Sequence, residues 1–318
     1  MQIDSRQLAA FAAVVREGSF EAAARVLHVT PSAVSQRIKG LEERLGRVLV
    51  QRGAPCVATQ AGQALQRHAQ QLQVLEADAL QGFGLAGASL ARNGRRGPGP
   101  GSALPLAIAV NADSLATWFV PAIAALREQH AVNFELHVED QDHSSALLRQ
   151  GRVMAAVTAE PQPVQGCSAE ALGAMRYVAV ASPAFMQRHF AQGVSDASLA
   201  TAPCTVFNGK DALQARFLRQ LTRKRLAPPQ HQVPSTHGFI HAALHGLGWG
   251  MNPQVLVAPL LAQGELVELV PGACLDVALY WQHWRLDSLV MRALSSGVHA
   301  AAREWLIPMA YRVHQRSA

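Results

Sequence analysis

A segment rich in glycine, proline and arginine divides this chain into two parts. Residues 92–102 read RNGRRGPGPGS. This composition supports neither a helix nor a central strand, because proline has no backbone N–H and glycine has no side chain to pack. The chain has 318 residues, enough for two or three domains that each bury a core. We therefore expect a hinge at residues 91–103, with separate domains before and after it.

Charge is distributed unevenly across this boundary. The chain carries 28 Lys+Arg and 22 Asp+Glu, a net charge of +6. Residues 1–96 hold 12 basic and 7 acidic side chains, whereas residues 97–318 hold 16 and 15, so five of the six excess charges precede the boundary. A basic head on a nearly neutral body is typical of a polyanion-binding domain attached to a globular domain.

Four cysteines lie far apart, without the spacing of a metal site or a disulfide framework: Cys56, Cys167, Cys204 and Cys274. We therefore expect no disulfide, metal or other cofactor, and this cysteine usage suits a reducing cytosol. The N-terminus lacks the apolar core of a signal peptide, and nowhere do 18 apolar residues follow one another. These features predict a cytoplasmic protein that does not enter a membrane.

Three short helices are predicted in the basic head. Apolar residues at i, i+3, i+4 and i+7 indicate one helix face, formed by Leu8, Phe11, Ala12 and Val15. This first helix covers residues 4–16 and ends at Gly18. Ser19 is a typical N-cap for a second helix, and Thr30 followed by Pro31 predicts the start of a third. Two short helices joined by a tight turn form a helix-turn-helix pattern.

The third predicted helix presents a polar, basic face. Glutamine can pair with adenine and lysine can donate to guanine, so side chains of these types can read base edges. We expect Gln36 to read a base and Arg37 and Arg52 to hold phosphates. The candidate DNA-binding residues are Thr30, Ser32, Ser35, Gln36, Arg37, Lys39 and Arg52. The alternative is that some of these side chains only cap the helix or face solvent.

Residues 20–52, FEAAARVLHVTPSAVSQRIKGLEERLGRVLVQR, resemble the DNA-binding signature of LysR-type transcriptional regulators. One departure is Val50, where the family usually has phenylalanine, and a branched aliphatic side chain can fill the same core position. The resemblance implies an all-α winged helix-turn-helix domain at residues 1–59 that binds double-stranded promoter DNA. A long linker helix at residues 60–90 would follow it.

Apolar residues recur near heptad positions in the predicted linker helix: Leu65, Leu72, Leu75, Ala79 and Leu80. This pattern favours a helix that pairs with a second copy, and hence a homodimer. The alternative is a single amphipathic helix packed on its own domain. Two linked heads imply a roughly palindromic DNA site, with half-sites one helical turn or a multiple of it apart. The family resemblance extends this expectation to a homotetramer that acts on RNA polymerase.

Short apolar runs alternate with helical patterns after the hinge, which predicts parallel sheets with helical crossovers. The expected strands cover residues 104–110, 134–138, 154–158 and 177–181, and the expected helices cover residues 116–129, 144–150 and 239–245. The LysR resemblance implies two Rossmann-like α/β subdomains of the periplasmic-binding-protein type at residues 104–318. Subdomain I would comprise residues 104–176 and 277–318, and subdomain II residues 177–276, with a small effector bound between them.

The sequences AVNADSLATWFVPAI at residues 109–123 and ELHVED at residues 135–140 resemble the ArgP or LysG branch of the family. Regulators of that branch respond to lysine and arginine and control basic amino-acid export or related metabolism. The resemblance therefore implies a basic amino acid as the effector of this chain.

Such a ligand needs anion donors at one end and carboxylates at the other. Hydroxyls at strand-to-helix turns can hold an α-carboxylate, and the candidates are Ser114, Ser235 and Thr236. Carboxylates for the cationic groups are Asp113 together with Glu139 or Asp140, which cluster near strand ends. Trp118 is a candidate apolar or cation–π wall. The alternative for each acidic residue is a solvated loop charge or a helix cap.

Enzyme motifs are absent at their proper spacing, so we expect a regulator and not an enzyme. Two alternatives stay open. The first is a LysR-type regulator with a different effector. The second is a nucleoid-type DNA-binding protein, whose DNA affinity would be indifferent to amino acids.

Overall fold

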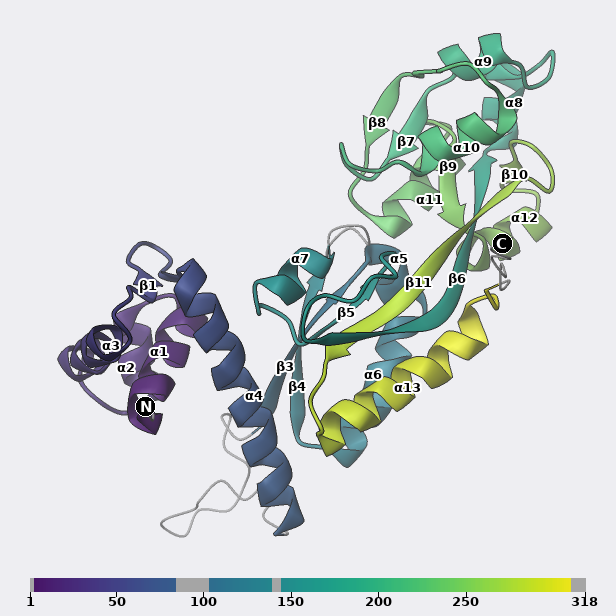
Figure 1. Cartoon of the computed structure of the whole chain (residues 1–318). Coiled ribbons are helices and arrows are strands. Elements are labelled where there is room, and N and C mark those ends of the chain that lie inside the picture. The colour runs from purple at the N-terminus through teal and green to yellow at the C-terminus, as the bar shows by residue number, and fades with distance from the viewer. Residues whose placement is uncertain (1–2, 84–102, 139–143, 310–318) are drawn as a thin grey trace, which may run out of the picture.

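The computed structural model describes residues 3–83, 103–138 and 144–309. A small helical head lies at one end, and a long helix leads from it to a larger α/β part (Figure 1). Residues 84–102, which contain the end of the predicted linker helix and nearly all of the predicted hinge, lie outside the described residues.

The head is a winged helix-turn-helix whose helices begin and end close to the predicted residues. Its elements are α1 (Ser5–Glu17), α2 (Phe20–Val26), α3 (Pro31–Leu45), β1 (Val50–Gln51) and β2 (Val57–Ala58). The side chains of Asp4, Ser19 and Thr30 accept hydrogen bonds from backbone N–H groups and cap the three helices. Gly18 ends α1 in the left-handed conformation, which glycine adopts without strain.

Glu42 holds the wing on α3, and Gly62 lets the following helix, α4, pack closely against the wing. Glu42 Oε1 accepts hydrogen bonds from the backbone N–H groups of Leu49 (2.8 Å) and Val50 (3.3 Å), which fixes the start of the wing on α3. At Gly62 an added Cβ would lie 2.2 Å from the carbonyl oxygen of Leu49, so only glycine permits this close approach of α4 to the wing.

Helix α4 (Gln60–Gly82) corresponds to the predicted linker helix and packs on both parts of the chain. Leu65 and Ala69 belong to the core of the head, whereas Val74 is fully buried in the core of the α/β part. Leu75 and Leu80 stay exposed, and Phe83 just beyond the helix is also exposed. The helix therefore packs on its own chain and still presents an apolar face to solvent.

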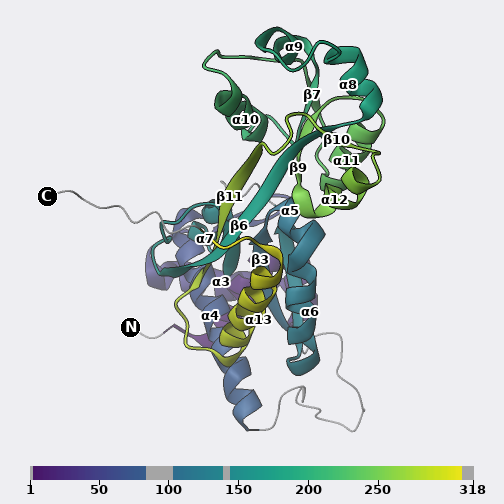
Figure 2. The same ribbon diagram turned by 90° about the vertical axis from the view of Figure 1, so that its right-hand side faces the viewer.

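The α/β part contains a seven-stranded mixed sheet in the order β10-β6-β11-β5-β3-β4, with β9 paired to β6. Its first half comprises β3 (Leu104–Val110), α5 (Ala112–Ser114), a π-helical turn (Leu115–Phe119), α6 (Val120–Gln129), β4 (Val132–Val138), α7 (Ser144–Arg149) and β5 (Ala155–Thr158). The last helix, α13 (Leu289–Trp305), packs beside α6 (Figure 2). We call this half, with its shares of β6 and β11, subdomain I.

The second half, subdomain II, lies at the other end of the two longest strands (Figure 1). It comprises α8 (Pro183–His189), α9 (Asp196–Thr201), β7 (Cys204–Val206), α10 (Leu213–Leu221), β8 (Gln230–Gln232), α11 (Thr236–Leu244), β9 (Gly250–Pro253), α12 (Gln254–Ala262) and β10 (Val267–Glu268). A short parallel pair, β7 with β8, adds a second small sheet.

Two long strands, β6 (Cys167–Ala181) and β11 (Cys274–Trp284), connect the halves and pair antiparallel with each other. The prediction of parallel sheets with helical crossovers was wrong for these two strands, because each runs from one half of the molecule into the other. The prediction also placed the strand start at residue 177, ten residues too late. Residues 167–176 mix buried and exposed side chains without regular alternation, so they carry no clear strand pattern.

Candidate functional site: a DNA-facing helix and a pocket between two subdomains

Helix α3 presents the predicted DNA-binding side chains on the side opposite its buried stripe. Ser32, Gln36 and Lys39 are exposed, whereas Val34, Ile38 and Leu41 are fully buried. The exposed face therefore carries hydroxyl, amide and ammonium groups that can reach base edges.

The other candidate residues of the head either shape the start of α3 or carry positive charge beside its exposed face. Thr30 Oγ1 accepts from the N–H of Ala33 at 3.2 Å and shares a 3.1 Å hydrogen bond with Ser32 Oγ, so Thr30 shapes the helix start. Ser35 and Arg37 are half-buried beside the exposed face. Arg52 is exposed on the wing, and its guanidinium lies 5.0 Å from the ring centre of Phe20, a cation–π contact that holds it beside α2.

A pocket lies between subdomain I and subdomain II. Residues of α5 line one side, and residues of α10, α11, β9 and the loop after β7 line the other: Asn111, Ala112, Asp113, Phe207, Asp211, Ala212, Leu213, Arg216, Thr236, Phe239, Met251, Asn252 and Pro253. Its empty space is about 690 Å³ including the part open to solvent.

Asp113 joins the two sides of this pocket. Its Oδ1 accepts a hydrogen bond from Thr236 Oγ1 and its Oδ2 accepts one from Tyr177 Oη, both at 2.6 Å. Thr236 is the first residue of α11, so the carboxylate also lies beside the positive end of a helix. The sequence predicted Asp113 and Thr236 separately, and the structure brings them into direct contact.

The other predicted effector residues lie in three different settings. Ser114 is fully buried, and its Oγ makes no hydrogen bond to the rest of the described chain. Ser235 Oγ accepts from the N–H of Gly238 at 3.1 Å and caps α11. Trp118 does not line the pocket, because it is fully buried and packs edge-on against Phe119. Glu139 and Asp140 lie outside the described residues.

Three polar residues at or near the pocket were not predicted from the sequence. Asp211 accepts from the N–H groups of Phe207 (2.8 Å) and Leu213 (3.0 Å) and so folds the loop that forms one wall. Arg216, on α10, adds a positive charge to the lining. Tyr177, on β6, is fully buried and reaches Asp113 from the strand that connects the subdomains.

Cys204, the first residue of β7, is a free and buried cysteine. Burial first, and then the negative charge of Asp211, raise the pKa of the Cys204 thiol to about 12. The thiol therefore stays protonated and is a poor nucleophile. In the parts of the chain that the structure describes, no three His, Cys, Asp or Glu side chains gather as a metal site. No helix among these residues is long and apolar enough to cross a membrane.

Comparisons with known proteins agree with both halves of this architecture. Residues 5–63 match the bacterial regulatory helix-turn-helix protein family of lysR type, and residues 101–303 match the LysR substrate binding domain. The chain is 49% identical over 301 residues to the HTH-type transcriptional regulator LysG of Mycobacterium tuberculosis, covering 95% of this chain and 94% of that protein.

Two further relatives carry informative descriptions. The lysine export transcriptional regulatory protein LysG of Corynebacterium efficiens is 41% identical, with 92% of this chain and 96% of that protein covered. The full-length LysG of Corynebacterium glutamicum with bound effector Arg has a TM-score of 0.73 and 37% identity, covering 96% of this chain and 100% of that one. The chain therefore belongs to the LysR family of DNA-binding transcriptional regulators and is not an enzyme.

Proposed function

We propose that this chain senses a basic amino acid, lysine or arginine, and controls genes for basic amino-acid export or metabolism. The observation that carries the proposal is the pocket between the subdomains, where the carboxylate of Asp113 faces the first turn of α11. Two of the relatives support it: one is described as a lysine export regulator, and another holds arginine as its effector.

The ligand enters between Asp113 and Thr236 in this proposal. Its α-ammonium takes the place of the two hydroxyls on the Asp113 carboxylate. Its α-carboxylate binds the Thr236 hydroxyl and the free N–H groups at the start of α11, with Ser114 as a further donor. Ser235 contributes by holding this helix start in shape.

The cationic end of the ligand requires a second carboxylate. Glu139 and Asp140 remain our candidates for it. Asp211 offers a further negative charge in the lining, although its two oxygens already accept backbone N–H groups. The positive charge of Arg216 would repel the cationic side chain of the ligand and attract its α-carboxylate. We therefore expect the α-carboxylate to lie toward α10 or α11.

The head binds double-stranded promoter DNA. We propose that Gln36 reads a base edge together with Ser32, Ser35 and Lys39, while Thr30 orients the helix start. Arg37 and Arg52 hold phosphates on either side. A regulator with this task works in the cytoplasm, where the chromosome lies.

The chain acts as a homodimer and homotetramer that influences RNA polymerase at the promoter. The exposed apolar side chains Leu75 and Leu80 of α4, with Phe83 just beyond it, support pairing of this helix with a second copy. Closure of the subdomains on the effector would change how the heads are placed on DNA.

A thermal-shift screen of the twenty amino acids on the full-length protein tests the proposal. A ligand that binds only the folded state raises the melting temperature by mass action. We expect lysine, arginine or both to raise it. If another compound raises the melting temperature and neither basic amino acid does, the effector assignment fails and the regulator assignment stands. If DNA affinity is also indifferent to every amino acid, the nucleoid-type alternative is favoured.

A further inference from the structure

Helix α4 contacts subdomain I at the C-terminal end of a short helix. Arg67 Nη2 donates hydrogen bonds to the carbonyl oxygens of Leu148 (3.3 Å) and Arg149 (2.6 Å), the last two residues of α7. The Leu148 carbonyl also accepts from the N–H of Gly151 at 3.1 Å, and both carbonyls carry the partial negative charge of the helix end. A guanidinium at this point therefore complements this charge and gives the Arg149 carbonyl a donor.

The same helix contacts the N-terminal end of α13 with the opposite charge. Asp78 Oδ2 accepts a hydrogen bond from the N–H of Leu289 at 2.8 Å, and Leu289 is the first residue of α13. Ser288 caps Met291, so Asp78 satisfies an N–H that the helix's own cap leaves open. Arg67 and Asp78 thus each match the sign of the helix end that they meet.

These two contacts are well separated along α4. Eleven residues at about 1.5 Å each place them roughly 16 Å apart. Between them, Val74 is fully buried in the core of the α/β part. Near Arg67 the backbone comes close at Gly151, which has φ +68°, and a Cβ there would lie 3.2 Å from the Cβ of Arg67. The helix is therefore fixed in position and in rotation on subdomain I.

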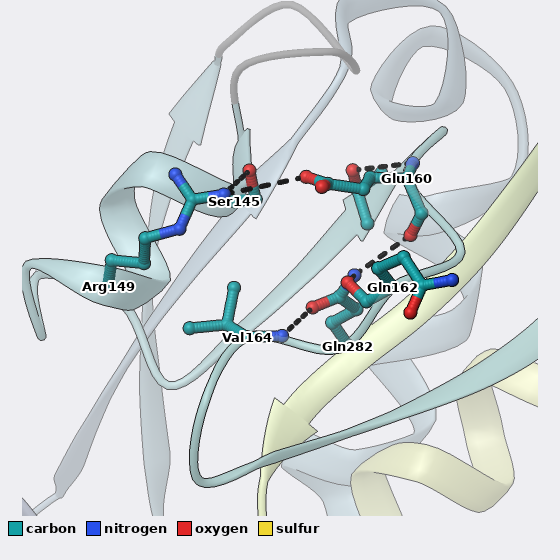
Figure 3. Close-up of polar contacts among 7 residues, drawn as sticks. Ser145, Arg149, Glu160, Gln162, Val164 and Gln282 are labelled. Atoms are coloured by element: carbon teal, nitrogen blue, oxygen red, sulfur yellow. Dashed lines mark hydrogen bonds and ion pairs between the residues drawn. The ribbon is translucent and has the colours of Figure 1, made fainter.

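Helix α7 is fixed in turn to a strand that connects the subdomains. Arg149 Nη2 lies 3.3 Å from Ser145 Oγ and 3.6 Å from Glu160 Oε2 (Figure 3). The buried amide of Gln282, on β11, donates to the carbonyl oxygens of Glu160 (2.8 Å) and Gln162 (2.9 Å). One chain of contacts thus leads from α4 through α7 and the loop after β5 to β11.

We propose that Arg67 and Asp78 are positioning residues that pass a change in the regulatory domain to the DNA-binding head. They act by holding α4 against α7 and α13, so that a reorientation of subdomain I moves the head with it. Neither residue lines the effector pocket. Their loss should therefore leave ligand binding intact and remove the effect of the ligand on DNA affinity. The proposal rests on the proposed function, because it assumes a ligand that changes DNA affinity.

The test measures the ratio of DNA dissociation constants with and without lysine or arginine, using full-length protein. The variants are Arg67→Ala, Asp78→Ala and the double variant. Glu76→Ala on α4 and Arg303→Ala on α13 are matched controls, because both remove an exposed charge nearby. We expect a ratio of about fivefold or more in the wild type and the controls. In the double variant the ratio falls to near one, while the ligand dissociation constant of the DNA-free protein stays within about twofold.

Conservative variants separate positioning from general stability. Arg67→Lys keeps a cation at the end of α7, and Asp78→Asn keeps an acceptor for the N–H of Leu289, so both should retain most of the ratio. A ratio in the double variant equal to that of the wild type overturns the proposal. Equal losses in the matched controls also overturn it.

Amide hydrogen exchange without ligand tests the contact itself. The N–H of Leu289 should exchange faster in Asp78→Ala than in the wild type or in Glu76→Ala. If lysine or arginine binds the wild type without changing its DNA affinity, the proposed coupling is overturned while the effector assignment stands, and the exchange experiment then decides whether α4 is held to α13. Equal exchange of the Leu289 amide in all three proteins contradicts the contact.

Discussion

Replacing Asp113 by asparagine removes a negative charge from the pocket with almost no change of shape. In the free protein its carboxylate accepts two hydrogen bonds of 2.6 Å, from Tyr177 and Thr236. Hydrogen bonds to a charged group contribute about 1.5–3 kcal/mol each, against about 1 kcal/mol for neutral ones. We therefore expect Asp113→Asn to lower the free energy of unfolding of the ligand-free protein by about 1–4 kcal/mol.

The effect on the ligand should be larger than the effect on stability. Removing the carboxylate that pairs with the bound α-ammonium should cost about 2–5 kcal/mol of binding free energy. At 1.4 kcal/mol per tenfold, this loss corresponds to a decrease in affinity of about 30-fold to several thousandfold. Tyr177→Phe is the matched control, because it removes one hydrogen bond and keeps the carboxylate. Because the ligand displaces the Tyr177 hydroxyl in the proposed complex, Tyr177→Phe should bind the ligand as tightly as the wild type or up to about tenfold more tightly, since one hydrogen bond contributes about 1 kcal/mol.

Isothermal titration of the full-length proteins with lysine and arginine measures both effects, and chemical unfolding measures the stability. If Asp113→Asn binds either effector within about threefold of the wild type, Asp113 is not the ammonium partner. An equal loss in Tyr177→Phe would show that the subdomain contact, and not the charge, determines affinity.

Three further predictions concern other parts of the chain. Gln36→Ala should relax base preference, whereas Arg52→Ala should weaken binding to all DNA sequences and make the affinity less dependent on salt concentration. If Gln36→Ala loses the same affinity for cognate and for random DNA, Gln36 does not read a base. Hydrogen bonds from His283 and then His299 lower the pKa of Glu170 in the folded protein. The ordinary pKa of a glutamate is 4.5, so above this pH Glu170→Gln should show its full loss of stability relative to the wild type. As the pH falls through the lower pKa of folded Glu170, the difference in melting temperature between the two proteins should disappear. Cys204, with its pKa raised to about 12, should resist iodoacetamide at pH 8 until the protein is unfolded, and rapid labelling of folded protein would contradict its burial.

Local chemistry explains why the head could be predicted closely from the sequence. Helix starts depend on one cap and the residues just after it, so Ser19 and Thr30 marked two helices correctly. The buried stripe of α3 follows a helical repeat that is visible in the sequence. Gly62, by contrast, has no special local pattern, and its importance comes from the wing backbone that lies against it.

The effector pocket could be predicted only in part, because its residues meet through the tertiary fold. Asp113 contacts residues 64 and 123 positions away, and no local pattern indicates that Tyr177 would reach it. Trp118 looked suitable as a wall by residue type, but the π-helical turn at Leu115–Phe119 places it in the core. The long strand β6 lacked regular alternation, so its antiparallel course between the subdomains was missed as well.

In our proposal, one chain couples recognition of a basic amino acid to recognition of a DNA site with two-fold symmetry. Selection of binding sites from random duplex DNA by the full-length protein, with and without lysine or arginine, tests it most directly. We predict enrichment of a palindromic site with half-sites about one helical turn or a multiple apart. We also predict an affinity for that site that changes about fivefold or more with one of the amino acids. Absence of an enriched sequence, or equal affinity with and without both amino acids, would contradict the claim.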